Sequence, residues 1–409
     1  MHILLIHQAF AAIDEPGGTR HHELALQLAG RGHHVTVITS PVSYLTGQSH
    51  GKQKITTEKI KLDGSTQGEV TIRRAYVYPA LHRSFFHRMI NFFSFMFSSF
   101  ISGLRVGKID LVWGTSPPIF QGVTAWLIAR IKGVPFLFEV RDLWPAFAVQ
   151  VGVLKNKWLI KASEWLERFL YSHADCVVVN SPGFISHVKR RGAKRVECVP
   201  NGSDTSMFDP QLDGYAFRQA HHLEGKFLVL YAGAHGMSND LDIVLQAAYS
   251  LRNQPNVMFT LVGDGKEKPA LVKKAAEMGL NNVCFLPPVP KNEMPQVLAA
   301  ANACLAILKP IPLYATVYPN KVFDYMSAGR PVILAIGGVI REVIETAGAG
   351  IYVQPGDSQS LVKAIQYLLS DPRRGKQMGQ NGRDYVKTHF DRAILAQQMA
   401  SIIEAMGES

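Results

Sequence analysis

The sequence predicts an α/β protein built from two doubly wound, Rossmann-like domains. Short apolar runs that are typical of buried parallel strands alternate with amphipathic helical segments along most of the chain. The alternation is interrupted at the Pro- and Gly-containing segment 199–210, and it restarts beyond that segment. With 409 residues, 47% of them hydrophobic, the chain can form two cores, each in a domain of roughly 200 residues. We therefore expect an N-terminal domain at 1–203 and a C-terminal domain at 204–387.

The N-terminal domain is expected to open with a βαβ unit. Apolar strands at 2–6 and 34–39 flank a segment whose apolar residues recur at helical spacing, and this order predicts a parallel sheet. The loop after the first strand carries Gly17 and Gly18, which allow backbone N–H groups to approach an anion, although a simple tight turn would use the same residues. The loop is not G-x-G-x-x-G, and no acidic residue ends the second strand, so nicotinamide binding is disfavoured.

The next segments differ sharply in composition. Residues 44–75 are polar and contain four glycines, so we expect a long, partly mobile insertion. The segment from Phe85 to Leu104 holds seven of the 21 Phe, and its apolar residues recur at helical spacing in a wide stripe. One interpretation is that this stripe simply packs on the sheet.

Charge favours a different role for that helix. Residues 1–200 hold 24 Lys and Arg against 13 Asp and Glu, whereas the rest of the chain holds 19 of each. A helix with a wide apolar face in a basic domain predicts docking on an anionic membrane surface through residues 83–108. Nucleic-acid binding is disfavoured, because the sequence shows no zinc-ligand spacing, RRM-type aromatic motif or long basic helix.

Two segments are candidates for ligand binding. An apolar strand at 134–140 ends in Glu139, Arg141 and Asp142, at the carboxyl end where open α/β sheets bind ligands. An ion-paired cluster that only holds the strand end is the alternative. In the second domain, a helix that begins at Asn320 directs free N–H groups at the space before it, which favours an anion. Lys321 adds charge for a phosphate, and Asp324 is placed to reach ribose hydroxyls, although an ordinary surface helix would also fit.

The segment 319–335 resembles the donor-nucleotide motif of retaining glycosyltransferases of family 4, E-x7-E followed by A-x-G-x-P. The crossover 199–210 resembles the P-N-G-x-D-x-x-x-F-x-P signature of that family. The resemblance implies the GT-B fold, with a cleft between the domains and a final helix at about 388–409 that packs back on the first domain. The chain departs from the family at Thr316, where the first Glu is expected, and at Ala234, where the family has Arg.

The resemblance also implies a reaction, transfer of a sugar from a UDP-type nucleotide, with retention at the anomeric carbon. Site residues implied by it for the donor are Gly17, Gly18 and Gly233, Val289 and Lys291 in the loop that meets the base, and Asn320, Lys321 and Asp324 for the diphosphate and ribose. His235 is expected to donate where the family has Arg. For turnover they are Arg141, Asp142 and Glu139. The stretch 139–145 resembles a bacterial subgroup that builds O-antigen and capsule units, including N-acetylfucosamine transferases, so the implied acceptor is a polyprenyl-diphosphate-linked glycan.

Other features of the sequence limit the possible functions and the location of the protein. No stretch of about 20 residues is apolar and uncharged, and the four cysteines form no C-x-x-C pair, so we expect a reduced, cytoplasmic protein on the inner face of the membrane. Asp240 and Asp242 imitate a D-x-D metal motif, but acids at a helix start usually complement its dipole, so we expect neither metal nor other cofactor. Two alternatives stay open: a GT-B-fold sugar-nucleotide epimerase, which needs no acceptor, and a non-catalytic nucleotide-sugar-binding module.

Overall fold

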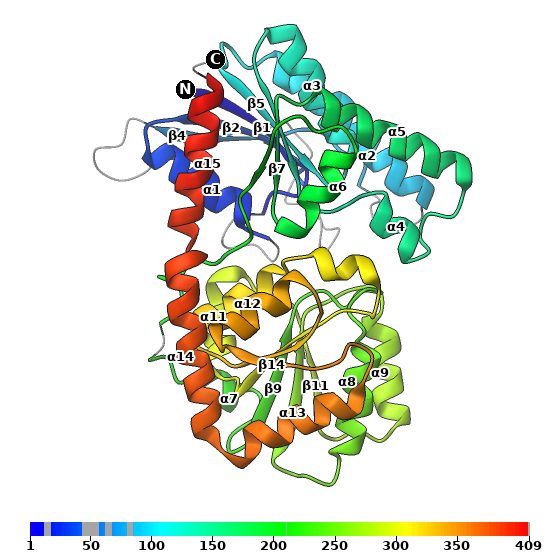
Figure 1. The fold of residues 1–409 in the computed structure, drawn as a ribbon, viewed down its shortest axis with the longest axis vertical. Helices are drawn as coiled ribbons and strands as arrows, with labels where there is room; N and C mark the ends of the chain where they lie inside the picture. The colour runs from blue at the N-terminus through cyan, green and yellow to red at the C-terminus, as the bar shows by residue number, and fades with distance from the viewer. Residues whose placement is uncertain (12–17, 43–56, 62–67, 80–84, 210, 408–409) are drawn as a thin grey trace. The chain divides into compact units, whose positions relative to one another are not determined.

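The computed structural model describes residues 1–11, 18–42, 57–61, 68–79, 85–209 and 211–407. The chain divides into two compact units (Figure 1). Unit 1 holds the chain up to Pro200 and takes it up again from Ala393, and unit 2 spans Asn201–Arg392. The division therefore falls three residues before the predicted boundary at Ser203.

Unit 1 is built on an eight-stranded sheet in the order β3-β4-β2-β1-β5-β6-β7-β8. The pairs are parallel except that β3 runs antiparallel to β4. The strands are β1 (His2–Ile6), β2 (His34–Thr39), β3 (Thr57–Lys61), β4 (Glu69–Arg74), β5 (Leu111–Ser116), β6 (Phe136–Val140), β7 (Cys176–Val179) and β8 (Val196–Cys198). Strands β3 and β4 correct the expectation of an insertion at 44–75, because the β-branched run around Val70 and Ile72 pairs with β2. The rest of that segment lies largely outside the described residues.

Helices cover both faces of this sheet. They are α1 (Arg20–Gly30), α2 (Phe85–Leu104), α3 (Phe120–Lys132), α4 (Ala146–Gln150), α5 (Lys157–His173), the 3-10 turn η1 (Pro182–Phe184), α6 (Ile185–Arg190) and α15 (Arg392–Gly407). The final helix α15 begins at Arg392, and its Leu395, Met399 and Ile403 are buried in the same apolar cluster as Leu24 of α1. Asn156 caps α5, since its Oδ1 accepts from the backbone N–H of Trp158 at 2.9 Å.

Helix α2 is oriented with polar side chains toward the protein. Asn91, Ser99 and Ser102 are buried, and the Asn91 amide accepts from Gln8 Nε2 at 2.7 Å. Phe86 and Phe97, by contrast, are 70% and 64% exposed. The apolar stripe is therefore split, because Phe92 and Phe95 pack inward while other members face outward. Packing on the sheet accounts for only part of the stripe.

Unit 2 is built on a fully parallel sheet of six strands in the order β11-β10-β9-β12-β13-β14. The strands are β9 (Phe227–Ala232), β10 (Val257–Val262), β11 (Val283–Leu286), β12 (Ala303–Ile307), β13 (Val332–Ala335) and β14 (Gly350–Tyr352). Alternate residues of β9 enter different apolar clusters, Leu228 and Leu230 in one, Val229 and Tyr231 in the other. This alternation is the mark of a sheet covered by helices on both faces.

Most helices of unit 2 connect successive strands. The helices of this unit are α7 (Tyr215–Ala220), α8 (Leu241–Ser250), α9 (Lys268–Glu277), η2 (Lys291–Glu293), α10 (Met294–Ala299), η3 (Pro312–Thr316), α11 (Asn320–Ser327), α12 (Val339–Ala347), α13 (Ser358–Ser370) and α14 (Pro372–His389). Of these, α7 precedes β9, and α13 and α14 follow β14. Helix α11 ends at Ser327, and Gly329, which has φ +66°, turns the chain toward strand β13. Within the described part of the chain, no helix has both the length and the apolar character needed to cross a bilayer.

Candidate functional site

Asp324, in the second turn of α11, is the centre of the polar cluster in unit 2. Ser203 donates its hydroxyl to Asp324 Oδ1 at 2.8 Å, and Lys291 Nζ lies 2.5 Å from Asp324 Oδ2. Lys291 and Asp324 are both almost completely buried. The structure thus brings together two residues that the sequence assigned separately to the base and the ribose. Ribose hydroxyls can bind this carboxylate only by sharing it with Ser203 or by displacing Lys291.

Lys321, on the same helix as Asp324, supplies a second cation. Its Nζ lies 3.9 Å from the ring centroid of Tyr231, and a Cβ at Gly233 would lie 2.6 Å from that nitrogen. The backbone at 233, with φ +145°, favours glycine, and a Cβ there would make the Lys321 ammonium shift. Burial lowers the pKa of Lys321 to about 7, and no carboxylate of the described residues offsets this shift. An anionic ligand beside Lys321 would restore its charge.

The loop after β9 is hydrogen-bonded to the loop after β10. The N–H of His235 donates to the carbonyl of Asp264 at 2.8 Å. A Cβ at Gly263, which has φ +147°, would lie 1.9 Å from the Gly233 carbonyl oxygen, and one at Gly265 would lie 2.5 Å from that of His235. Only glycine allows the two loops to approach so closely.

The side chain of His235 is covered by this packing. The imidazole is fully buried, 5.9 Å from the ring of Tyr231 and 6.3 Å from that of Phe285. Burial, together with the neighbouring Lys268 and Lys321, lowers the pKa of His235 to about 4. A neutral imidazole does not supply the positive charge of the arginine that the family has at position 234, and donation of a hydrogen bond by His235 stays a prediction. Lys321 is left to provide the charge.

Two more residues of unit 2 were predicted from the sequence to bind the donor, Val289 and Asn320, and Thr316 is the position where the chain departs from the family. Val289 is partly buried and packs on the apolar cluster that contains Val322. Asn320 is the first residue of α11, and its Oδ1 is buried without a hydrogen-bond partner among the described residues. The Thr316 hydroxyl donates to the carbonyl of Leu313 at 2.6 Å.

Glu139 is the centre of a second buried cluster, in unit 1. Its Oε1 accepts from Arg20 Nε at 2.9 Å, while its Oε2 lies 2.7 Å from His21 Nε2 and accepts from Trp113 Nε1 at 3.1 Å. Burial alone would raise the pKa of Glu139, but His21 and Arg20 hold it well below its usual range. With no exposed surface and both oxygens bound, Glu139 cannot contact a ligand here. This corrects the expectation that it acts directly, and gives it a positioning role.

His7 and His21 are site residues that the sequence analysis missed. Their rings lie 3.9 Å apart, with His7 Nδ1 2.8 Å from Thr115 Oγ1 and His7 Nε2 3.5 Å from Arg141 Nη1. Because Arg141 can only donate, Nε2 of His7 accepts and Nδ1 donates. Burial lowers the pKa of His7 well below its ordinary value, and His21 and Arg141 add to the effect. The available signal was a polar residue directly after the first strand, at the carboxyl end of β1.

Arg141 and Asp142 follow β6, as predicted. A Cβ at Gly18 would lie 3.6 Å from Arg141 Nη2, so the structure brings these two predicted residues together. Gly17 lies outside the described residues. Burial raises the pKa of Asp142 to about 7, against the opposing effects of the Leu143 N–H and of Arg141. Its carboxyl therefore changes charge near neutral pH.

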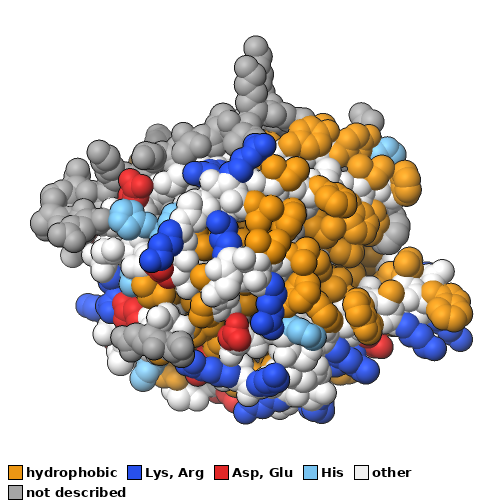
Figure 2. All heavy atoms as spheres, turned by 90° about the horizontal axis from the view of Figure 1, so that it is seen from above, with side chains coloured by type: hydrophobic (Ala, Val, Ile, Leu, Met, Phe, Trp, Pro, Cys, Tyr) orange, Lys and Arg blue, Asp and Glu red, His pale blue; other side chains and the backbone are white. Residues whose placement is uncertain are grey.

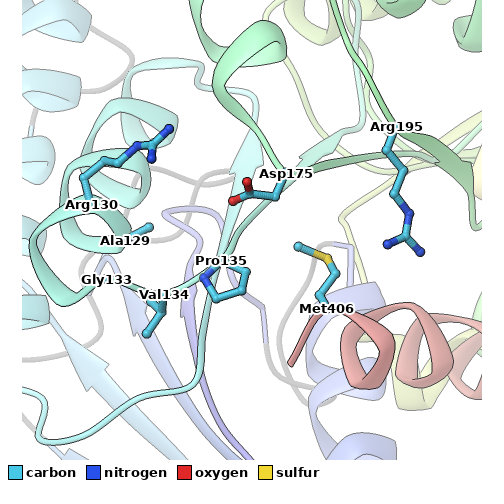
Figure 3. Close-up of a pocket in the computed structure, with 8 residues that line it drawn as sticks. All are labelled: Ala129, Arg130, Gly133, Val134, Pro135, Asp175, Arg195 and Met406. Atoms are coloured by element: carbon cyan, nitrogen blue, oxygen red, sulfur yellow. The ribbon is translucent and has the colours of Figure 1, made fainter. Parts of the chain in front are cut away.

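A hollow of about 560 Å³ lies elsewhere in unit 1 (Figure 3). It is lined by Ala129, Arg130, Gly133, Val134, Pro135, Asp175, Arg195 and Met406. Pro135 and Asp175 directly precede β6 and β7, so the hollow is at the amino ends of these strands. Asp175 Oδ2 accepts from the N–H of Phe136 at 2.8 Å. Because parallel sheets bind ligands at their carboxyl ends, we do not assign this hollow to the site.

Two doubly wound units, each with charged side chains at the carboxyl ends of its strands, form the GT-B fold. Residues 17–202 match the family described as "Glycosyl transferase 4-like domain", and residues 216–385 match that described as "Glycosyl transferases group 1". Both matches are to glycosyltransferase domains and together they extend over most of the chain, which relates it to the glycosyltransferases. The two parallel-sheet units confirm the predicted fold class.

Individual relatives agree with this assignment. The chain is 25% identical over 397 residues to "Putative colanic acid biosynthesis glycosyl transferase WcaI" of Escherichia coli (strain K12), covering 93% of this chain and 94% of that protein. Its fold is similar to that of Anabaena HepE in complex with UDP and glucose, with a TM-score of 0.71, 18% identity and coverage of 99% and 100%. WaaG, a glycosyltransferase involved in lipopolysaccharide biosynthesis, gives a TM-score of 0.70 at 18% identity, with coverage of 98% and 99%.

Proposed function

We propose that this chain transfers an N-acetylated amino or deoxy sugar from a UDP-type nucleotide to a lipid-linked glycan during synthesis of a surface polysaccharide such as O-antigen or capsule. The observation that carries the proposal is that helix α11 bears both the Asp324 carboxylate, which is paired with Lys291, and the buried ammonium of Lys321 beside Gly233. The relationship to WcaI, a putative colanic acid biosynthesis glycosyl transferase, and the fold shared with WaaG support the product class, and the ligands of HepE support the donor.

In this proposal the donor is held by unit 2. The free N–H groups of α11 and the Lys321 ammonium face the diphosphate, and Asp324 accepts from the ribose diol. When the diol takes the place of Lys291 on Asp324, the Lys291 ammonium becomes available to a phosphate or the base. Charge on the leaving diphosphate is then balanced by the chain's own cations, so we propose that no metal ion is required. Full activity with EDTA is the expected result, and activity restored only by Mg²⁺ would contradict it.

Turnover is assigned to unit 1. We propose that the Asp142 carboxylate stabilises the positive charge that develops on the sugar, and that Arg141 orients the acceptor. Glu139 contributes by fixing Arg20 and His21, whose ring stacks on His7 beside Arg141. A front-face reaction of this kind retains the anomeric configuration. NMR of the product, followed from a donor of known anomeric form, distinguishes retention from inversion.

The acceptor is proposed to reach the enzyme at the cytoplasmic face of the membrane, through α2 and its flanks, residues 83–108. Phe86, Phe93 and Phe97 are exposed, while the polar residues of α2 are used inside the protein. The Ser98 hydroxyl likewise bonds within the protein, since it donates to the Tyr76 carbonyl at 2.5 Å. An outward apolar face in a basic domain suits an anionic lipid surface.

A donor screen tests the whole proposal. Each nucleotide sugar is incubated with and without a polyprenyl-diphosphate glycan, and nucleotide release is measured. Release of UDP that requires the lipid acceptor supports transfer. Conversion of the sugar nucleotide without acceptor would establish the epimerase alternative, and tight binding without any conversion would establish a binding module, which the departures at Thr316 and Ala234 would then explain.

The donor site is tested separately at Asp324. Because hydrogen bonds to charged groups are worth about 1.5–3 kcal/mol, Asp324→Ala should weaken UDP binding at least about tenfold. Asp324→Asn keeps an acceptor oxygen and controls for the Lys291 charge left unpaired. Asp242→Ala is the matched control, since this exposed carboxylate of the same unit pairs with Lys274 on the surface. Calorimetry that finds unchanged UDP affinity in both Asp324 variants would exclude the assignment.

A further inference from the structure

The outer surface of α5 carries an aromatic and cationic stripe. Trp158, Lys161, Trp165 and Arg168 recur at spacings of three, four and three residues, which places them on one helix face. Trp158 is 80% exposed and Trp165 is 64% exposed. The Lys161 ammonium lies 5.8 Å from the ring centroid of Trp158. Two tryptophans at this exposure on one helix are unusual for a surface that faces only water.

The acidic residues of α5 are directed elsewhere. Glu167 is buried and lies 2.7 Å from His187 Nε2, and Glu164 is 3.3 Å from Arg191. The carboxylates are therefore engaged by α6 and the residue after it. The outward stripe keeps its positive charge, because the Lys161 and Arg168 side chains are exposed while these acids are paired.

Packing makes α5 continuous with the docking surface proposed for α2. The ring of Phe93 in α2 lies 5.1 Å from that of Phe120 in α3, and the ring of Trp126 in α3 lies 4.8 Å from that of Phe169 in α5. Helix α3 thus lies between α2 and α5, and its own outer side exposes Leu127 and Ile131. In Figure 2, hydrophobic side chains gather over one broad area of unit 1, with Lys and Arg side chains beside it.

We propose that the stripe of α5, with the exposed apolar side of α3, is a second membrane-contact surface of this protein, which binds anionic lipid headgroups. Tryptophan rings favour the boundary between headgroups and acyl chains, and Lys161 and Arg168 complement anionic phosphates. A second copy of the chain is the weaker candidate, since a self-complementary contact would bring these cations against like charges. The inference rests on the proposed membrane docking, and extends its contact surface from α2 across α3 to α5.

The experiment is flotation of the full-length protein with vesicles of phosphatidylcholine and phosphatidylglycerol. Trp158→Ser with Trp165→Ser should reduce vesicle binding by roughly tenfold, similar to Phe93→Ser with Phe97→Ser on α2. The matched control is Tyr215→Ser with Tyr367→Ser, which removes two exposed aromatic rings of unit 2 and should leave binding unchanged. Lys161→Glu with Arg168→Glu should abolish the preference for anionic over neutral vesicles, whereas Lys363→Glu should not.

The outcomes separate this inference from the proposed function. If the α2 variant loses binding and the α5 variants bind as wild type does, the α5 surface is refuted and docking through α2 stands. If the wild-type protein itself ignores anionic vesicles, both are wrong. Dissociation of a dimer by the tryptophan variants, with vesicle binding unchanged, would make the stripe an interface between copies. Circular dichroism and UDP binding confirm that each variant is folded.

Discussion

Lys321 is the residue whose charge the proposed donor site depends on most. Its ammonium rests on the Tyr231 ring with the room that Gly233 leaves, and its pKa is lowered to about 7 by burial. In the free protein it is protonated below pH 7 and loses its charge above it. Because a diphosphate binds the charged form, binding should draw a proton from solution near neutral pH.

We predict that UDP affinity falls as pH rises from 6.5 to 8.5, by up to about tenfold per unit above the pKa. Lys321→Met should weaken binding at pH 6.5 by about 1.5–3 kcal/mol and remove the pH dependence. Calorimetry in two buffers with different heats of ionisation measures both the affinity and the proton uptake. Lys363→Met, an exposed lysine of α13, should behave as wild type. A steep pH dependence that survives in Lys321→Met would assign the titration to another group.

Asp142 leads to the second prediction at this scale. Since burial raises its pKa to about 7 and the carboxylate is the proposed active form, kcat at saturating donor should rise between pH 6 and 8. Asp142→Asn should lower kcat by about 100-fold or more and flatten this rise, while UDP affinity changes little. Equal losses in kcat and in UDP affinity would mean that Asp142 belongs to donor binding instead.

At the scale of elements, the loops of unit 2 that follow β9 and β10 pack closely against each other, because glycines at the contact have no side chains. Gly263→Ala would place a Cβ 1.9 Å from the Gly233 carbonyl oxygen at φ +147°. We predict a loss of about 1–3 kcal/mol in the free energy of unfolding from backbone strain, and weaker UDP binding as the loops separate. Urea denaturation and calorimetry measure the two effects.

Gly236→Ala is the matched control within the same loop. Its added Cβ would meet only Asn239 Nδ2, at the ordinary contact distance of 3.6 Å, so stability and UDP binding should remain close to wild type. If Gly263→Ala is as harmless as the control, the close approach of the loops has no role in binding.

At the scale of the whole molecule, the formal net charge of +11 is concentrated in residues 1–200. Attraction to an anionic vesicle is screened by salt, with a Debye length of about 10 Å at 0.1 M and about 3 Å at 1 M. We therefore predict that binding of the intact protein to phosphatidylglycerol vesicles weakens strongly from 0.05 to 0.5 M NaCl, while UDP affinity at a buried site weakens less. Flotation at fixed lipid and calorimetry compare the two, and vesicle binding that is insensitive to salt would contradict an electrostatic contribution.

The sequence by itself determined the fold class and much of the candidate site. The features that determined them are local, because each depends only on residues that are near one another in the chain. They are the strand and helix periodicity, the turn residues of segment 199–210, and the order loop, helix, glycine and strand at 319–335. They were enough to identify two doubly wound domains. They also identified Lys321 and Asp324 on one helix, and Arg141 and Asp142 at a strand end.

Tertiary structure decided which of these side chains are free to bind a ligand. Lys291 lies on Asp324, 33 residues away in the chain, and Glu139 is bound by Arg20 and His21, more than 100 residues away. Spacing cannot reveal such partners, because contact between distant segments depends on how strands are ordered in the sheet. The burial of His235 near Tyr231 and Phe285 could not be predicted for the same reason. Periodicity also identified α2 as amphipathic but not which side packs inward, because that depends on where the sheet lies.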